Sequence, residues 1–266
     1  MSSYFQGKTV LITGASSGIG AALANSLANR GANLILLARQ IESLKALAGK
    51  LEPKTQVQTI SLDITDELAV NQLASRINLH AIDILINNAG IAHCARFEDL
   101  FQTDFRSMMD VNYLGQVWMT RLILPVMKEN GEGQIINIAS MAGVLGLAGY
   151  TAYGASKHAL VGFTEALRNE LSGSNIDLTL VLPSDVDTPQ LEKEALNKPA
   201  ATRALAGRIK PLSANRASTK ILQAIEKRKR EVVVSPFFGR VQLKLCRLFP
   251  GISKKVLDSI TRPHNH

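Results

Sequence analysis

Hydrophobic residues along this chain gather in two kinds of segment. Short apolar runs are predicted to be strands buried on both faces of a sheet, and they cover residues 8–13, 33–38, 57–62, 82–86, 134–139, 177–182 and 232–235. Between them, apolar residues recur every three or four positions, which is the period of a helix with one buried face. These predicted helices cover residues 21–29, 42–51, 66–77, 97–127, 153–171 and 213–230.

Strands that alternate with helices in this way predict an α/β fold with a parallel, doubly wound sheet. Ligands of such sheets bind beyond the carboxyl ends of the strands. Glycine-rich or polar motifs follow several of the predicted strands, at residues 14–20, Asp63, residues 87–90 and Ser140. We therefore expect these motifs to meet at one edge of the sheet and to form one site.

The first predicted strand is followed by the turn Gly14-Ala15-Ser16-Ser17-Gly18-Ile19-Gly20 and then by a helix. Glycines allow a sharp turn and a close approach of the backbone to a pyrophosphate, whose charge is favoured at a helix N-terminus. The spacing Gly-x-x-x-Gly-x-Gly differs from the more common Gly-x-Gly-x-x-Gly. The context of strand, turn and helix favours a dinucleotide site over an ordinary tight turn.

The end of the second predicted strand bears on the choice of cofactor. An acidic residue there would bind the 2′-hydroxyl of the adenosine ribose, whereas a basic residue accommodates a 2′-phosphate. The chain has Arg39 at this point and no carboxylate before Glu42. This charge pattern favours NADP(H) over NAD(H); the alternative is that Arg39 is a solvated loop charge.

Tyr153 and Lys157 are four residues apart in a predicted helix and therefore share one face. A cation beside a phenol favours the phenolate and lowers the pKa of the tyrosine, so the pair is a candidate general acid/base near neutral pH. A Tyr-x-x-x-Lys spacing also arises readily by chance. The spacing therefore indicates a catalytic pair only in combination with the motifs that precede it in the chain.

Composition and charge bear on which kinds of site and partner we expect. The chain has 266 residues, 46% of them hydrophobic, and its 2 Cys and 5 His have no metal-ligand spacing, so we expect no metal site. The N-terminus has neither a signal peptide nor a membrane span, which suggests a cytoplasmic protein. Residues 203–266 contain 15 Lys/Arg against 3 Asp/Glu, a net charge of +12, whereas residues 1–202 contain 15 against 19, a net charge of −4.

The pattern divides the chain into a domain at residues 1–235 and a basic amphipathic C-terminal extension at residues 236–266. Within the domain, residues 189–212 are polar and rich in Ala and Lys, and we expect a mobile substrate loop there. In the extension, apolar and basic residues interleave at helical spacing over residues 236–262. This pattern is compatible with peripheral contact with an anionic membrane; the alternative is docking on the protein's own body or on a second subunit. No motif for reading nucleic acid is present.

Taken in order, these residues resemble the short-chain dehydrogenase/reductase (SDR) family over about residues 7–235. The matching motifs are Thr13-Gly14-x-x-x-Gly18-x-Gly20, Asp63, Asn87-Asn88-Ala89-Gly90, Asn112, Ser140, Tyr153-x-x-x-Lys157 and Pro183…Thr188. The resemblance implies one Rossmann-fold domain with seven parallel strands in the order 3-2-1-4-5-6-7, and a homodimer or homotetramer. It departs at Pro183-Ser184, where glycine commonly follows the proline.

The resemblance also implies roles for individual residues. Tyr153 would protonate a carbonyl oxygen, and Lys157 would lower the pKa of Tyr153 and hold the nicotinamide ribose. Ser140 would orient the substrate oxygen, and Asn112 would hold a water molecule of a proton relay. The cofactor-binding positions would be Gly14, Ser16, Ser17, Gly18, Ile19, Gly20, Arg39, Asp63, Ile64, Asn87, Ala89, Gly90, Tyr153, Lys157, Pro183, Val186 and Thr188.

The sequence thus predicts an NADP(H)-dependent oxidoreductase that acts on CH–OH groups by hydride transfer to or from a carbonyl/secondary alcohol substrate. An apolar or lipid-like substrate is suggested by the loop that carries Val144, Leu145 and Leu147. Two alternatives remain: a non-catalytic dinucleotide-sensing protein, and a membrane-surface scaffold that uses the basic extension.

Overall fold

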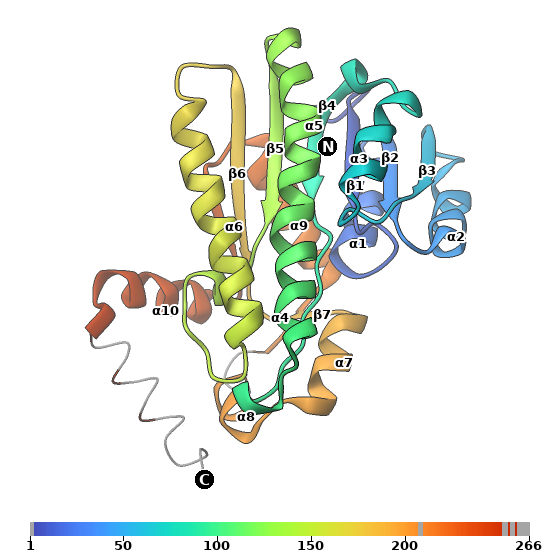
Figure 1. Cartoon of the computed structure of the whole chain (residues 1–266). Helices are drawn as coiled ribbons and strands as arrows, with labels where there is room; N and C mark the ends of the chain where they lie inside the picture. Colours follow the sequence, from blue (N-terminus) through green and yellow to red (C-terminus); the bar gives the residue numbers. More distant parts are fainter. Residues whose placement is uncertain (1–2, 207–209, 252–254, 256–258, 260–266) are drawn as a thin grey trace.

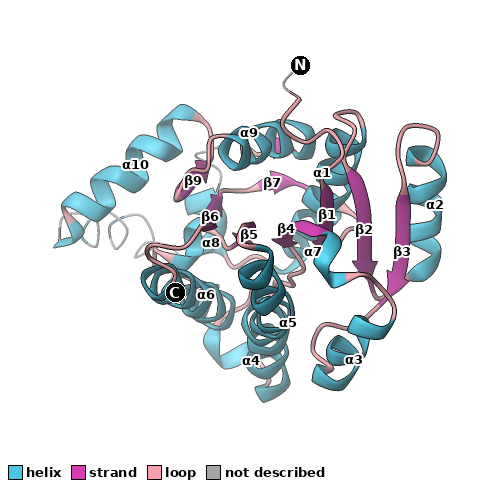
Figure 2. Cartoon of the chain, turned by 90° about the horizontal axis from the view of Figure 1, so that it is seen from above, coloured by secondary structure: helices cyan, strands magenta, loops and turns pink. Residues whose placement is uncertain are grey.

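The computed structural model describes residues 3–206, 210–251, 255 and 259. A central parallel sheet lies between two layers of helices (Figures 1 and 2). Its strands follow the order β3-β2-β1-β4-β5-β6-β9, which confirms the predicted seven-stranded topology. The strands are β1 (Thr9–Thr13), β2 (Asn33–Ala38), β3 (Val57–Ser61), β4 (Ile82–Asn87), β5 (Gly133–Ile138), β6 (Ile176–Pro183) and β9 (Glu231–Val234). The seventh strand is labelled β9 because two short strands, β7 (Val186–Asp187) and β8 (Leu212–Ser213), pair separately.

Successive side chains of a strand point to opposite faces of a sheet. The apolar strands therefore contribute side chains to two hydrophobic cores, one on each face. In β1, Val10 and Ile12 belong to one core and Leu11 belongs to the other. The first core is covered by α1 (Gly18–Ala28), α2 (Ile41–Leu51) and α9 (Ala214–Glu226). The second is covered by α3 (Glu67–Gln72), α5 (Gly115–Asn130) and α6 (Thr151–Glu170), with α4 (Gln102–Met109) packed beside α6.

The region 97–127, predicted as one helical stretch, is interrupted in the structure. A 3₁₀ turn (Phe97–Asp99) precedes α4, and a π-helical turn (Asp110–Leu114) separates α4 from α5. The turn widens the backbone around Asn112, whose amide group bonds to the Ile91 backbone and to Ser156. Such π turns are common at functional sites. Further 3₁₀ turns are Leu73–Ser75, Leu79–Ala81 and Met141–Gly143.

The prediction of a loop over residues 189–212 is wrong in its secondary structure. This segment forms α7 (Pro189–Asn197) and α8 (Ala200–Ala206), while residues 207–209 lie outside the described chain. The side chain of Thr188 caps α7, and Pro189 occupies the first helical turn, where its missing N–H costs nothing. A hydrogen bond from Thr202 to the Ala148 carbonyl oxygen (2.8 Å) ties α8 to the loop before α6. Mobility of this segment stays a prediction.

The C-terminal extension begins with α10 (Phe237–Leu248), an amphipathic helix as predicted. It lies beyond β9 at one edge of the sheet (Figure 2). The part of the predicted extension after residue 251 lies outside the described residues, except for residues 255 and 259. Among the helices that the structure describes, none is long and apolar enough to cross a bilayer.

Candidate active site

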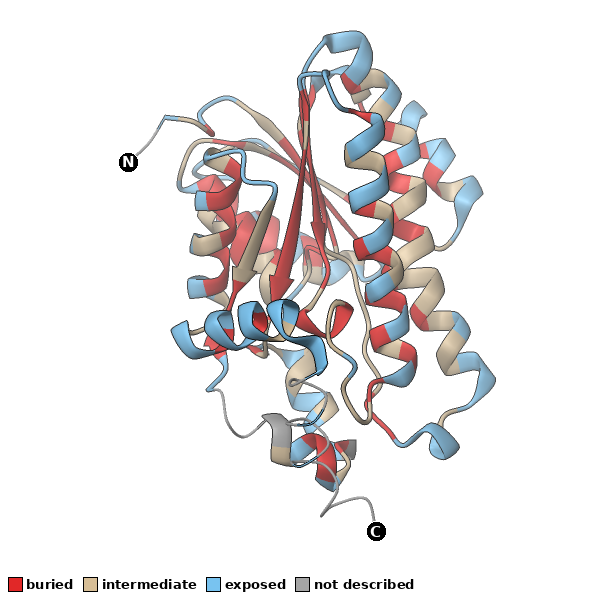
Figure 3. Ribbon diagram, turned by 90° about the vertical axis from the view of Figure 1, so that its left-hand side faces the viewer, coloured by how far each residue is buried: buried red, intermediate tan, exposed pale blue. Residues whose placement is uncertain are grey.

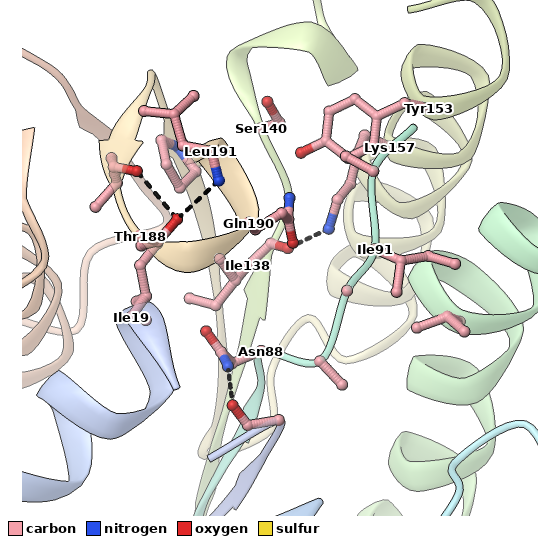
Figure 4. Close-up of a pocket in the computed structure, with 18 of the residues that line it drawn as sticks. Ile19, Asn88, Ile91, Ile138, Ser140, Tyr153, Lys157, Thr188, Gln190 and Leu191 are labelled. Atoms are coloured by element: carbon pink, nitrogen blue, oxygen red, sulfur yellow. Dashed lines mark hydrogen bonds between the residues drawn. The ribbon is translucent and has the colours of Figure 1, made fainter. Parts of the chain in front are cut away.

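A cavity of about 760 Å³ opens at the carboxyl ends of the strands. Its walls come from the turn after β1, the ends of β2, β4, β5 and β6, and helices α6 and α7 (Figure 4). Most residues that the sequence nominated line this one space: Gly14, Ser16, Ser17, Gly18, Ile19, Arg39, Asp63, Ile64, Ala89, Gly90, Ser140, Tyr153, Lys157, Pro183, Val186 and Thr188.

Four hydrogen bonds join the glycine turn after β1 to the turn after β4. The Asn88 side-chain amide donates to the carbonyl oxygens of Thr13 and Gly14, at 3.0 Å each. The Thr13 hydroxyl oxygen accepts from the N–H groups of Asn88 and Ala89, also at 3.0 Å. Gly14 has φ = +64°, and a Cβ there would lie 2.7 Å from the Ala89 Cα. Glycine is therefore required at this position for both conformation and space.

The N-terminus of α1 faces this turn without a capping side chain. Ser17 occupies the N-cap position but makes no side-chain cap hydrogen bond, and the first turn of α1 has no acidic residue. Unpaired N–H groups and the helix dipole at this end favour an anion. Gly18 has φ = +54°, and a Cβ there would lie 3.1 Å from Thr188 Cγ2, so the turn passes close under the start of α7. These residues fit the pyrophosphate of a dinucleotide.

Three nominated residues do not line the cavity: Gly20, Asn87 and Asn112. A Cβ at Gly20 would overlap the Gly14 carbonyl oxygen, so this glycine serves the packing of the turn. Asn87 is fully buried, and its amide donates to Asn137 Oδ1 (2.9 Å) and Thr120 Oγ1 (3.0 Å). The Asn87 side chain therefore faces the core and not the cavity, and the cofactor contact predicted for Asn87 stays a prediction.

Tyr153 and Lys157 lie one turn apart on α6 and face the same space. Lys157 Nζ is 5.9 Å from the centre of the Tyr153 ring. The lysine side chain is buried and donates to the Ile138 carbonyl oxygen at 2.9 Å. The Ser140 side chain, which follows β5, lies close enough to the Tyr153 phenol to lower the pKa of that phenol. Helix α6 and strand β5 thus bring together the three groups of the predicted proton-transfer site.

The electrostatics of this pair differ from the prediction. Burial raises the pKa of Tyr153, the nearby Ser140 hydroxyl lowers it in part, and the charges of Glu194 and Asp185 raise it further. Burial lowers the pKa of Lys157 to about 7. A lysine that loses its proton near neutral pH offers little positive charge to stabilise a phenolate. The group of this pair that titrates near pH 7 is therefore the amine.

Asn112 is fully buried in the π-helical turn. Its Oδ1 accepts from the Ile91 N–H (2.8 Å), and its Nδ2 donates to the Ile91 carbonyl oxygen and to Ser156 Oγ, at 2.9 Å each. A Cβ at Gly90 would lie 3.2 Å from Asn112 Oδ1 and 3.4 Å from Lys157 Nζ. Gly90 therefore leaves room between the two side chains that the prediction links by a water molecule.

Arg39 is exposed at the rim of the cavity, beyond the end of β2. The first carboxylate after it, that of Glu42, pairs with Lys45 at 3.2 Å. Asp63, after β3, accepts from the N–H (3.0 Å) and the hydroxyl (2.8 Å) of Thr65, which holds its carboxylate at the edge of the cavity.

Serine at position 184 does not strain the backbone. Among the described residues, Arg228 is the one non-glycine residue with positive φ, so Ser184 adopts an ordinary conformation. Its N–H donates to the Val234 carbonyl oxygen at 3.1 Å. The departure from the family pattern at Pro183-Ser184 is therefore accommodated.

Sequence reasoning missed a group of polar side chains in the wall of the cavity. The Tyr150 hydroxyl donates to Glu194 Oε2 at 2.8 Å, and the Gln190 amide donates to Glu194 Oε1 at 3.1 Å. The Tyr150 ring centre is 5.6 Å from that of Tyr153. The sequence signal that could have found Tyr150 is its spacing of three residues from Tyr153. No local pattern marked Glu194, which reaches Tyr150 from 44 positions away in the chain.

Comparisons with known proteins agree with this geometry. A 3-ketodihydrosphingosine reductase from Bos taurus is 38% identical over 207 residues, which is 74% of this chain and 62% of that protein. The chain thus matches less than two thirds of the length of that relative. A dehydrogenase/reductase SDR family protein 7-like from Anopheles gambiae is 35% identical over 263 residues, covering 94% of this chain and 81% of the relative.

Solved structures of the same fold carry either of two dinucleotides. A short-chain dehydrogenase/reductase from Burkholderia phymatum in complex with NAD has a TM-score of 0.81 and 26% identity, covering 94% of this chain and 96% of that one. One from Burkholderia cenocepacia in complex with NADP has a TM-score of 0.77 and 27% identity, covering 96% and 97%. The family model described as short chain dehydrogenase matches residues 8–199. Its motifs, its fold and these matches show that the chain belongs to the short-chain dehydrogenase/reductase family.

Proposed function

We propose that this protein is an NADP(H)-dependent oxidoreductase that interconverts a carbonyl and a secondary alcohol on an apolar, lipid-like substrate. The observation that carries the proposal is the meeting of Tyr153, Ser140 and Lys157 in the cavity that the glycine turn also lines. A proton donor and a dinucleotide cradle at one cavity are what hydride transfer to a carbonyl requires.

In the reductive direction, a dinucleotide held in this cavity would supply the hydride for the carbonyl carbon. Tyr153 gives its phenolic proton to the carbonyl oxygen, and Ser140 orients that oxygen by a hydrogen bond. Lys157, with a pKa of about 7, returns a proton to Tyr153. Asn112 stands across the space beside Gly90 and would hold the water that links Lys157 to solvent. The product is the alcohol, and one proton is taken up from water.

The cavity also indicates which residues would hold the dinucleotide. The turn at residues 14–19 and the start of α1 suit the pyrophosphate, and Asp63 with Ile64 suits the adenine. Arg39 suits a 2′-phosphate, since a guanidinium can donate to phosphate oxygens and the carboxylate of Glu42 is paired with Lys45. The charge at Arg39 supports NADP(H) over NAD(H); the solved structures of the same fold include complexes with either dinucleotide.

The apolar part of the cavity supports a lipid-like substrate. Leu145 and Leu147, from the loop before α6, line it together with Leu191 of α7. The Bos taurus relative is named a 3-ketodihydrosphingosine reductase, after a lipid ketone. We extend that substrate class, an apolar chain that bears a ketone, to this protein.

The carboxylate of Glu194 supports a narrower substrate class. Within the part of the chain that the structure describes, its carboxylate has hydrogen bonds to Tyr150 and Gln190 but no ion pair. The nearby acid Asp185 is paired with Lys198 at 3.5 Å. The charge of Glu194 is thus available to a cationic group of a ligand, and it lies close enough to raise the pKa of Tyr153. We propose that substrates with a protonated amino group near the carbonyl are preferred.

The test is oxidation of NADPH by the purified chain across ketones and aldehydes of increasing chain length, with Tyr153→Phe alongside. We expect turnover to improve with chain length and to fall by more than about 100-fold in the variant, the size expected for loss of a general acid. Tyr4→Phe removes a phenolic hydroxyl outside the cavity and is the matched control. Near-normal turnover of Tyr153→Phe would reject the acid role. Tight NADPH binding without turnover of any carbonyl would favour the dinucleotide-sensing alternative.

A further inference from the structure

Helix α10 is held on the body of the protein by one face. Leu243 is buried, with 1% of its surface exposed, and it packs in the cluster that contains Leu180 and Leu182 of β6. Arg247 forms a two-pronged ion pair with Glu231 of β9, at 2.6 and 2.9 Å. The helix is therefore a fixed part of the fold. The side chains of its opposite face point away from the protein body.

That other face is apolar and exposed. Five large hydrophobic side chains of α10 are left open to solvent: Phe238 (80% exposed), Leu248 (70%), Phe237 (66%), Leu245 (51%) and Val241 (38%). At about 100° per residue they fall within an arc of about 100° on the helix. Figure 3 shows α10 as a largely exposed rod across the front of the molecule. Single exposed hydrophobic residues are ordinary, but a contiguous exposed stripe marks a contact surface.

Basic side chains border this arc. Arg240 and Lys244 lie along one side of it, and the Arg240 guanidinium is 5.9 Å from the centre of the Phe237 ring. Residues 237–248 contain no acidic residue. An apolar stripe with a cationic margin is the pattern of a helix that lies in the interface of an anionic bilayer, with its hydrophobic side chains below the headgroups. A protein partner with an apolar groove would not require the cationic margin.

The other side of the arc borders the active-site cavity. Gln242, between Val241 and Leu243, lines that cavity. At about 100° per residue it follows Phe238 around the helix, on the side away from Arg240 and Lys244. Any membrane or protein surface that contacts the apolar arc therefore lies beside the cavity. Leu145 and Leu147 are apolar residues of the cavity wall.

We propose that α10 docks the protein on an anionic lipid surface and holds the cavity mouth against it, so that an apolar substrate passes between bilayer and active site without crossing water. The docking rests on the surface of α10 alone. Only the passage of substrate rests on the function proposed above, so the two can fail separately.

The test is flotation of the full chain with vesicles of phosphatidylcholine, alone or with about 30% phosphatidylserine. We expect at least about 10-fold more protein to float with the anionic vesicles, and salt at about 0.5 M to reverse much of that difference, because it screens the basic margin. The double variant Phe238→Ser/Leu245→Ser should lose at least about 10-fold of the binding. Leu68→Ser is the matched control, since Leu68 is 74% exposed on α3, near the opposite edge of the sheet (Figure 2).

A second variant, Arg240→Gln/Lys244→Gln, keeps the apolar arc intact and should lose the preference for anionic vesicles. Tyr153→Phe should float as the wild type does, so that a failure of catalysis is told apart from a failure of docking. Equal flotation of wild type and Phe238→Ser/Leu245→Ser, or no flotation of the wild type, would overturn the proposal. So would a shift of that variant from dimer to monomer in sedimentation without a change in flotation, since α10 would then join two copies of this chain.

Discussion

Lys157 should make the stability of the ligand-free protein rise with pH, and Lys157→Met should remove that rise. Burial lowers the pKa of this lysine from 10.5 to about 7 in the folded protein. Between these two values the unfolded chain carries the proton and the folded chain does not. Folding must therefore release a proton in this range, and it becomes more favourable as the pH increases. Below about pH 7 the proton stays on in both states and the dependence disappears.

The magnitude follows from the difference between the two pKa values. A shift of one unit corresponds to about 1.4 kcal/mol, so the full cost of the charged, buried amine is about 5 kcal/mol below pH 7. Between pH 7 and pH 9, this one group should raise the free energy of unfolding by about 2 kcal/mol. The hydrogen bond from Lys157 to the Ile138 carbonyl oxygen contributes at both pH values and largely cancels from the difference.

The assay is equilibrium unfolding in urea at pH 7 and pH 9, with the wild type, Lys157→Met and Lys128→Met. Lys128 is exposed on α5, so its replacement should leave the pH dependence as in the wild type. We expect the wild type to gain about 2 kcal/mol more than Lys157→Met between the two pH values. Parallel behaviour of the wild type and Lys157→Met, within about 0.5 kcal/mol, would refute the reasoning, because it would mean that the buried amine keeps its proton.

Two further predictions concern specificity. Arg39→Asp should lower the ratio of kcat/KM with NADPH to kcat/KM with NADH by at least about 10-fold, the size of one lost charge-assisted hydrogen bond; an unchanged ratio would reject Arg39 as the 2′-phosphate contact. Glu194→Gln should lower the kcat/KM for an amino ketone, relative to a plain ketone of equal chain length, by at least about 10-fold for the same reason. Steady-state kinetics on the two matched ketones measures this, and a parallel loss on both would assign Glu194 a structural role only.

Much of the fold followed from local patterns. Apolar runs without alternation marked strands buried on both faces, and the helical period between them marked crossover helices. The strand order was implied by the family resemblance, and the observed order matches it. The interruption of the predicted helical region at Asp110–Leu114 had no such signal, because it depends on hydrogen bonds of Asn112 to Ile91 and Ser156. The helical state of residues 189–206 was missed as well, because polar, alanine-rich composition fits a loop as readily as a surface helix.

The sequence by itself determined where the chemistry lies: the glycine turn, Ser140, Tyr153 and Lys157 each follow a strand or begin a helix, and parallel strands bring their carboxyl ends together. Only the tertiary structure decided how these groups behave. The pKa of Lys157 depends on enclosure by β5 and α6, and the nearness of Glu194 to Tyr150 depends on how α7 folds back over the cavity. The sequence likewise marked α10 as amphipathic, but which of its side chains are buried depended on its packing beside β6 and β9, since burial is set by contacts between distant parts of the chain.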